Sequence, residues 1–143
     1  MIKPFPLYKQ LDAMDCGPTC LRMVAKYYGR SVSLDHLRNK SQYGKQGVSM
    51  LGLADAAESI GLKSVGAKIS FEQLVNDAPL PAILHWDQYY FVVLTPSSTE
   101  NKLVIADSAR GLIKLQNEDF IKRWISKMER KKESGFLLSS VVI

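Results

Sequence analysis

The segment QLDAMDCGPTCLRMVAKYYG, residues 10–29, decides which fold the chain is expected to adopt. An apolar stripe recurs within it at helical spacing and consists of Leu21, Val24, Ala25 and Tyr28. This spacing predicts an amphipathic helix. Asp15 is a suitable N-cap, Pro18 fits the first turn, and Gly29 is a residue type at which helices commonly end. Cys16 is therefore predicted to lie at the N-terminus of this helix.

The predicted position of Cys16 favours a reactive thiol. The unpaired N–H groups and partial positive charge of a helix N-terminus lower a thiol pKa, and only the thiolate is a strong nucleophile. The same N–H groups can donate to a carbonyl under attack, and the neutral amide of Gln10 can complete such an oxyanion hole. Cysteines also begin helices in ordinary cores, so position alone leaves a structural role open. Cys20, one turn later, is predicted to be buried packing.

The composition narrows the class of protein. A chain of 143 residues with 46% hydrophobic and 23% charged residues is predicted to form one folded domain over residues 1–143. Two cysteines exclude a disulfide framework, and with only His36 and His85 beside them no metal site is expected. The chain lacks a signal core and an apolar run of about 18–20 residues, so the predicted compartment is the cytosol.

The net charge of +5 favours acidic partners only weakly. The most basic segment, KMERKKES at 127–134, is predicted to be a solvated loop rather than a patch for nucleic acid or lipid headgroups.

The order of predicted elements indicates an α+β fold. Serine N-caps precede three further predicted helices, LDHLRNK, MLGLADAAESI and FEQLVN, the last with a capping box between Ser70 and Gln73. Residues 62–69 are predicted to form a short strand. Short β-branched segments then follow, AILHW, YYFVVLT, KLVIAD and GLIKL, and predict an antiparallel meander or barrel-like sheet. A helix capped by Asn117 and a final strand, GFLLSSVVI, complete the pattern.

These segments together resemble one family. The block Q-x-D-x-x-D-C-G-x-x-C, with GVSMLGLADAAESIGL, LPAILHW, FVVL and IADSARGLIKL, resembles the N-terminal peptidase domain of bacteriocin- and peptide-exporting ABC transporters over about residues 6–143. Members are papain-like cysteine peptidases that cut leader peptides after a Gly-Gly pair during export. The resemblance implies a papain-like α+β fold, no cofactor, and a place at the cytoplasmic face of the bacterial inner membrane.

The resemblance also implies partners. These are the leader peptide of an exported cargo and the transmembrane and nucleotide-binding domains of a parent transporter, which would continue past Ile143. No nucleic-acid partner is expected. The chain contains no Walker A glycine loop, so this segment is not expected to bind ATP.

Residue by residue, the resemblance assigns Cys16 as the nucleophile, Gln10 as the oxyanion-hole donor and Asp107 as the acid that orients the base. A strand-end aspartate can equally be a simple turn former. The family places its general-base histidine at the start of H-F-V-V, and here that position is Tyr90. A phenol with a pKa near 10 donates hydrogen bonds at neutral pH and accepts no proton, so hydrolysis is expected to fall by several powers of ten.

His85 is a possible surrogate base. If a two-residue turn follows Trp86, then His85 lies opposite Tyr90 and can reach toward Cys16. The alternative is a histidine that packs beside Trp86 at the mouth of the sheet. Family members with a normal catalytic histidine also often carry H-W at this place, which favours packing.

Two accounts of Tyr90 follow. The domain has either degenerated into a module that binds and tethers cargo without cutting it, or it is a competent enzyme with an isolated substitution. The retention of Gln10, Cys16 and Asp107 together favours the isolated substitution, because an abandoned site has little reason to keep all three.

The predicted substrate is a leader that ends in Gly-Gly and has an amphipathic helix upstream, which needs a hydrophobic groove beside the cleft. The candidate lining residues are apolar or aromatic and are Met50, Leu51, Leu53, Ala54, Tyr89 and Phe91.

Overall fold

The structure is a computed structural model that describes residues 5–41, 49–87, 90–124, 127–129 and 132–142, without the side chains of Ala13 and of 127–142. The helices are η1 (Ala13–Asp15, a 3-10 turn), α1 (Cys16–Tyr27), α2 (Leu34–Lys40), α3 (Met50–Ser59), α4 (Phe71–Asp77) and α5 (Asn117–Trp124). The strands are β1 (Leu62–Ser70), β2 (Ala82–Trp86), β3 (Tyr90–Leu94), β4 (Leu103–Asp107), β5 (Gly111–Leu115), β6 (Lys127–Glu129) and β7 (Lys132–Val142).

The helix starts follow from local hydrogen bonds. The hydroxyls of Ser33, Ser49 and Ser70 accept the N–H groups of His36, Gly52 and Gln73, as the sequence predicts. Helix α1 begins at Cys16 as predicted, and Gly29 follows it with a left-handed φ of 85°. Helix α5 begins at Asn117 itself, and the carbonyl of Gln116 accepts the first helical N–H, so the predicted cap is wrong by one residue.

Asp15 does not cap α1 through its side chain, which corrects the prediction. Its fully buried carboxylate forms an ion pair with Arg38 of α2, with Arg38 Nε 2.8 Å from Asp15 Oδ1 and Arg38 Nη2 on Oδ2. Asp12 caps the preceding turn η1 instead and accepts the N–H of Met14 at 2.9 Å. The residue before Cys16 is therefore tied to a second helix.

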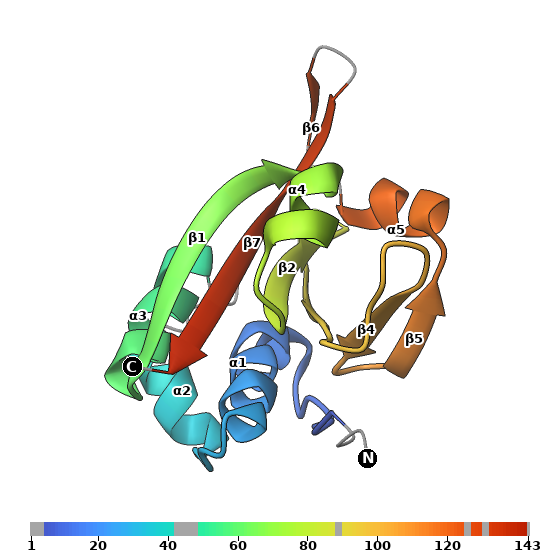
Figure 1. Cartoon of the computed structure of the whole chain (residues 1–143). Helices are drawn as coiled ribbons and strands as arrows, with labels where there is room; N and C mark the ends of the chain where they lie inside the picture. The colour runs from blue at the N-terminus through green and yellow to red at the C-terminus, as the bar shows by residue number, and fades with distance from the viewer. Residues whose placement is uncertain (1–4, 42–48, 88–89, 125–126, 130–131, 143) are drawn as a thin grey trace.

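The strands form one antiparallel sheet in the order β1-β7-β2-β3-β4-β5, with β6 paired to β7 (Figure 1). Strands β2 to β5 form the predicted meander. Strand β7 inserts between β1 and β2, and pairs from Leu62↔Val142 to Ser70↔Ser134 along β1. The predicted solvated loop at 127–134 is wrong, because β6 pairs there with the start of β7 in a hairpin that projects from the body of the molecule (Figure 1).

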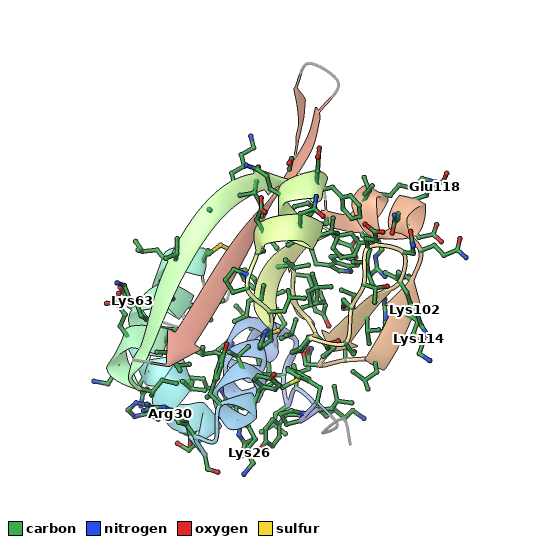
Figure 2. All side chains as sticks on the ribbon, in the orientation of Figure 1. Lys26, Arg30, Lys63, Lys102, Lys114 and Glu118 are labelled. Atoms are coloured by element: carbon green, nitrogen blue, oxygen red, sulfur yellow. The ribbon has the colours of Figure 1, made fainter. Side chains whose placement is uncertain are left out.

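The two faces of the sheet carry separate cores. Along β3, Phe91 and Val93 pack with α1, α2 and α3, whereas Val92 and Leu94 pack with α4 and α5. This alternation is the period of two that a strand requires. Labelled basic side chains lie at separate places in Figure 2, with Lys26, Arg30 and Lys63 beside the helical half and Lys102 and Lys114 beside β4 and β5. The labelled positive charges are thus distributed over more than one region.

Candidate active site

The start of β3 and the end of β4 bring Tyr90 and Asp107 together. Tyr90 Oη donates to Asp107 Oδ1 at 2.5 Å, and also lies 3.5 Å from Gln10 Oε1. Gln10 comes from the extended segment before η1, and its backbone N–H donates to the carbonyl of Ser108 at 2.9 Å. Three of the residues that the sequence singles out therefore meet at one place.

Asp107 is both a turn former and the partner of Tyr90. Its Oδ1 accepts the backbone N–H groups of Ala109 at 2.8 Å and Arg110 at 3.2 Å, which fixes the turn between β4 and β5. The residue is buried, and its Oδ2 has no hydrogen-bond partner among the residues that the structure describes. Oδ1 of Asp107 thus accepts hydrogen bonds from Tyr90, Ala109 and Arg110, while Oδ2 accepts none from the residues that the structure describes.

Cys16 lies at the N-terminus of α1, beside the start of β3, and is 7% exposed. Burial raises the pKa of the Cys16 thiol above its ordinary value of 9.0. Backbone hydrogen bonds at Phe91, Gly17 and Cys16 itself lower this pKa and offset burial only in part. The backbone N–H groups at the helix N-terminus thus lower the thiol pKa as expected, but desolvation is the larger effect and the net shift of the pKa is upward.

Both cysteines of α1 lie against the start of β3. Cys20 is fully buried, as expected, and its Sγ donates to the carbonyl of Phe91 at 3.3 Å. The backbone of Phe91 also lies close enough to the Cys16 thiol to lower its pKa. The position of the Cys16 sulfur relative to Tyr90, the neighbour of Phe91, is therefore fixed by the packing of α1 on the sheet.

Tyr90 is a neutral phenol in this site. Burial, then the hydrogen bond to Asp107, raises the pKa of Tyr90 far above its ordinary value. A group of this kind holds its proton at neutral pH and donates it to Asp107. It cannot take the proton of a thiol whose own pKa is raised.

The predicted placement of His85 opposite Tyr90 is wrong. Trp86 pairs with Tyr90, and His85 pairs with Phe91, because three residues rather than two separate the strands. A shift of one residue moves a side chain to the other face of a strand. The imidazole of His85 instead packs against the ring of Phe91, with 5.4 Å between centroids, and burial lowers its pKa.

The candidate groove residues fall into two groups. Leu51 is 73% exposed on α3, and Met50 and Ala54 are partly buried beside the same core. Leu53 is fully buried in that core, so it offers no surface to a ligand and the prediction for it is corrected. Phe91 is 6% exposed in the same core, and both side chains lie close to Gly17. Tyr89 lies outside the described residues.

Ser108 is a member of the site that the sequence reasoning missed. It is buried, and its Oγ donates to Gln10 Oε1 at 2.7 Å. The sequence feature that could have indicated it is a hydroxyl residue, Ser108, directly after the strand-end acid Asp107 in IADSARG. A cavity of about 310 Å³ borders this turn and is lined by Leu7, Tyr8, Lys9, Asp107, Ser108, Ala109, Arg110 and Gly111. The turn that carries Asp107 and Ser108 therefore borders a cavity, which Cys16, Gln10 and Tyr90 do not line.

Among the described residues, no cluster of three or more His, Cys, Asp or Glu side chains is arranged to hold a metal ion. In the same residues, no helix has the length and apolar character needed to cross a membrane.

Two transport/processing proteins are similar in sequence to most of this chain. It is 32% identical over 114 residues to the colicin V secretion/processing ATP-binding protein CvaB of Escherichia coli, which covers 80% of this chain and 16% of that protein. It is 33% identical over 123 residues to the pediocin PA-1 transport/processing ATP-binding protein PedD of Pediococcus acidilactici, with coverages of 80% and 17%. The chain thus spans about one sixth of the length of these relatives.

Two solved structures share the fold. A double glycine motif protease from an AMS/PCAT transporter, in complex with the leader peptide, matches with a TM-score of 0.83 and 28% identity over 96% of this chain and 91% of that chain. The peptidase domain of Streptococcus ComA matches with a TM-score of 0.80 and 28% identity, over 98% and 100%. The papain-like α+β fold expected from the sequence is confirmed. The Peptidase C39 family model matches residues 4–130, and this chain belongs to that family.

Proposed function

We propose that this chain is the leader-recognition unit of a peptide-exporting ABC transporter, and that its peptidase activity is strongly impaired. The unit binds leader peptides that end in Gly-Gly, at the cytoplasmic face of the bacterial inner membrane. Its further partners are the transmembrane and nucleotide-binding domains of the transporter. The kinship with transport/processing proteins and with a protease solved in complex with the leader peptide supports this assignment.

The proposed chemistry assigns one role to each polar group. Cys16 Sγ is the nucleophile that attacks the carbonyl carbon of the second glycine of the Gly-Gly pair, and the amide of Gln10 donates to the oxygen that becomes negatively charged. Asp107 orients residue 90. A histidine at position 90 would take the thiol proton and later give it to the leaving amine. Tyr90 cannot perform that transfer, because its proton is held by the site.

The observation that carries the impairment is the contact of 2.5 Å between Tyr90 Oη and Asp107 Oδ1. In this contact the phenol of Tyr90 occupies the carboxylate of Asp107, which would otherwise orient a histidine base. With the thiol pKa of Cys16 also raised by burial, neither a thiolate nor an acceptor for its proton is available at neutral pH. Binding needs neither group, so leader recognition is expected to survive.

A leader-binding measurement tests the proposal. A fluorescent synthetic leader ending in Gly-Gly, followed by several cargo residues, is titrated with the unaltered protein and with Cys16→Ala, and fluorescence anisotropy is recorded. A leader of the same composition in scrambled order is the control. Equal affinity of both proteins for the true leader, with no cleavage product by mass spectrometry, is expected. No preference over the scrambled leader would refute leader recognition, and cleavage abolished by His85→Ala would identify His85 as a working base.

A further inference from the structure

We propose that Ser108 is a positioning residue, whose hydroxyl holds the side-chain amide of Gln10 in the orientation that an oxyanion donor needs. This inference rests on the proposed role of Gln10 at the carbonyl under attack. It concerns what fixes that amide rather than whether the site cuts peptides. A side-chain amide has a carbonyl end and an NH₂ end, and only the NH₂ end can stabilise a negatively charged oxygen.

Ser108 contacts Gln10 twice. Its Oγ donates to Gln10 Oε1 at 2.7 Å, and its carbonyl accepts the backbone N–H of Gln10 at 2.9 Å. The first contact has the short distance of a strong hydroxyl bond. The second ties the extended N-terminal segment to the turn after β4. Both the backbone and the side chain of Gln10 are therefore hydrogen-bonded to one buried residue, Ser108.

Tyr90 competes poorly for the same oxygen. Its hydroxyl has one proton, and Asp107 Oδ1 lies at 2.5 Å whereas Gln10 Oε1 lies at 3.5 Å. The proton therefore goes to Asp107, and the longer contact contributes little. The Ser108 hydroxyl is thus the main donor to the carbonyl end of the amide.

The other end of the amide is available. Within the described part of the chain, Gln10 Nε2 donates to no protein acceptor, while Oε1 is held by Ser108. An amide with its oxygen held and its nitrogen unused is pre-organised to donate to a ligand oxygen, and pre-organised donors are the source of oxyanion stabilisation.

One turn therefore positions two groups. Asp107 holds residue 90 and Ser108 holds Gln10, and the turn itself is fixed by bonds from Ala109 and Arg110 to Asp107 Oδ1. Replacing Ser108 with alanine removes a hydroxyl that these turn bonds do not use. We therefore expect Ser108→Ala to loosen the amide while the turn keeps its shape.

A reversible covalent ligand measures this effect without hydrolysis. In a leader aldehyde ending in Gly-Gly-CHO, Cys16 Sγ bonds to the aldehyde carbon, the C=O double bond becomes a single bond, and the thiol proton ends on the oxygen beside Gln10. Ser108→Ala should weaken aldehyde binding by about 3- to 10-fold, the range for loss of one hydrogen bond to a neutral hydroxyl oxygen. Affinity for the matching leader amide, which forms no covalent bond, should stay within about twofold.

Two further variants separate positioning from general damage. Ser108→Thr keeps the hydroxyl and should restore tight aldehyde binding. Ser98→Ala removes another partly buried hydroxyl, which bonds Val104, and should leave aldehyde binding unchanged. In a Gln10→Ala background, Ser108→Ala should add no further loss, because residues that act through one group are not additive. Equal losses for aldehyde and amide, or additive losses with Gln10→Ala, would overturn the proposal.

A readout without any peptide keeps the inference separate from the proposed function. The ¹⁵N order parameter of the Gln10 side-chain amide should fall to below about 0.6, the flexible range, in Ser108→Ala and stay high in Ser98→Ala. A rigid amide in Ser108→Ala would overturn the positioning role. If the amide loosens as expected but no leader binds to any variant, the proposed function is wrong and the positioning role stands.

Discussion

Loss of Arg38 should destabilise the fold far more than loss of its exposed partner. Arg38 bonds the carboxylate of Asp15, whose side chain is fully buried, and also lies 3.2 Å from Asp35, whose side chain is 86% exposed. Removing one member of a buried pair leaves an uncompensated charge, so Arg38→Met should cost about 3–5 kcal/mol of unfolding free energy. Methionine retains an apolar stem of similar length, which limits the cavity.

The same arginine supplies matched controls. Asp35→Asn removes an exposed pair and should cost at most about 1 kcal/mol. Asp15→Asn leaves a neutral amide in the buried position and an Arg38 side chain that is 28% exposed, so about 1–3 kcal/mol is expected. The order Arg38→Met, then Asp15→Asn, then Asp35→Asn follows from burial alone.

Urea unfolding followed by the fluorescence of the buried Trp86 and Trp124 measures these differences. With a slope of about 2 kcal/mol per M, Arg38→Met should lower the midpoint by roughly 2 M. If Arg38→Met shifted the midpoint no more than Asp35→Asn, the carboxylate of Asp15 would not depend on its partner, and the account of how the start of α1 is held would be refuted.

Three further predictions concern the thiol, the β2–β3 loop and a glycine. Because burial raises the pKa of Cys16 above 9.0, its alkylation by iodoacetamide should rise about tenfold per pH unit from pH 7 to beyond 9, and a plateau below pH 8 would contradict this. Asp87 has a left-handed φ of 51°, and its carboxylate accepts a hydrogen bond from Arg123 at 2.7 Å. Both variants lose the charge, but asparagine tolerates this backbone better than alanine, so in urea unfolding Asp87→Ala should lose about 1–2 kcal/mol more unfolding free energy than Asp87→Asn. Gly61→Ala should cost more than Gly29→Ala in the same assay. Both have a left-handed φ, but only at position 61 would the new Cβ lie 2.6 Å from Arg30 Nη1 and push this side chain off its hydrogen bond to the carbonyl of Ile60; equal costs would count against loss of that bond.

Local signals in the sequence account for much of the fold. The serine caps, the glycine stop at 29 and the capping box at Ser70 are decided by residues within one turn of each other, and all three match the structure. The insertion of β7 between β1 and β2 joins residues far apart in the chain, and no local pattern specifies that pairing. The hairpin of β6 and the start of β7 was not predicted, because its sequence, KMERKKES, has the high charge that is typical of a solvated loop.

The sequence singled out Gln10, Tyr90 and Asp107, which meet in the structure, but it pointed neither to Ser108 nor to the electrostatics of the site. Gln10 and Asp107 both contact Tyr90, and the catalytic roles that the resemblance implies for them stay predictions. The register around His85 depended on one extra turn residue, which periodicity cannot count. The thiol pKa of Cys16 depended on how deeply α1 packs on β3, a tertiary property that outweighs the local helix terminus.

Cleavage by Tyr90→Phe and Tyr90→His tests the central claim most directly. Phenylalanine removes the hydroxyl that occupies Asp107 but adds no base, whereas histidine adds the base, so both are compared with the unaltered protein in single-turnover cleavage of the Gly-Gly leader. The account predicts product only with Tyr90→His, at a rate at least about 10³-fold above the other two, as removal of a base from such a site implies. Product loss on combining Tyr90→His with Cys16→Ala would tie that rate to the thiol. Comparable cleavage by the unaltered protein would contradict the claim that Tyr90 impairs the site.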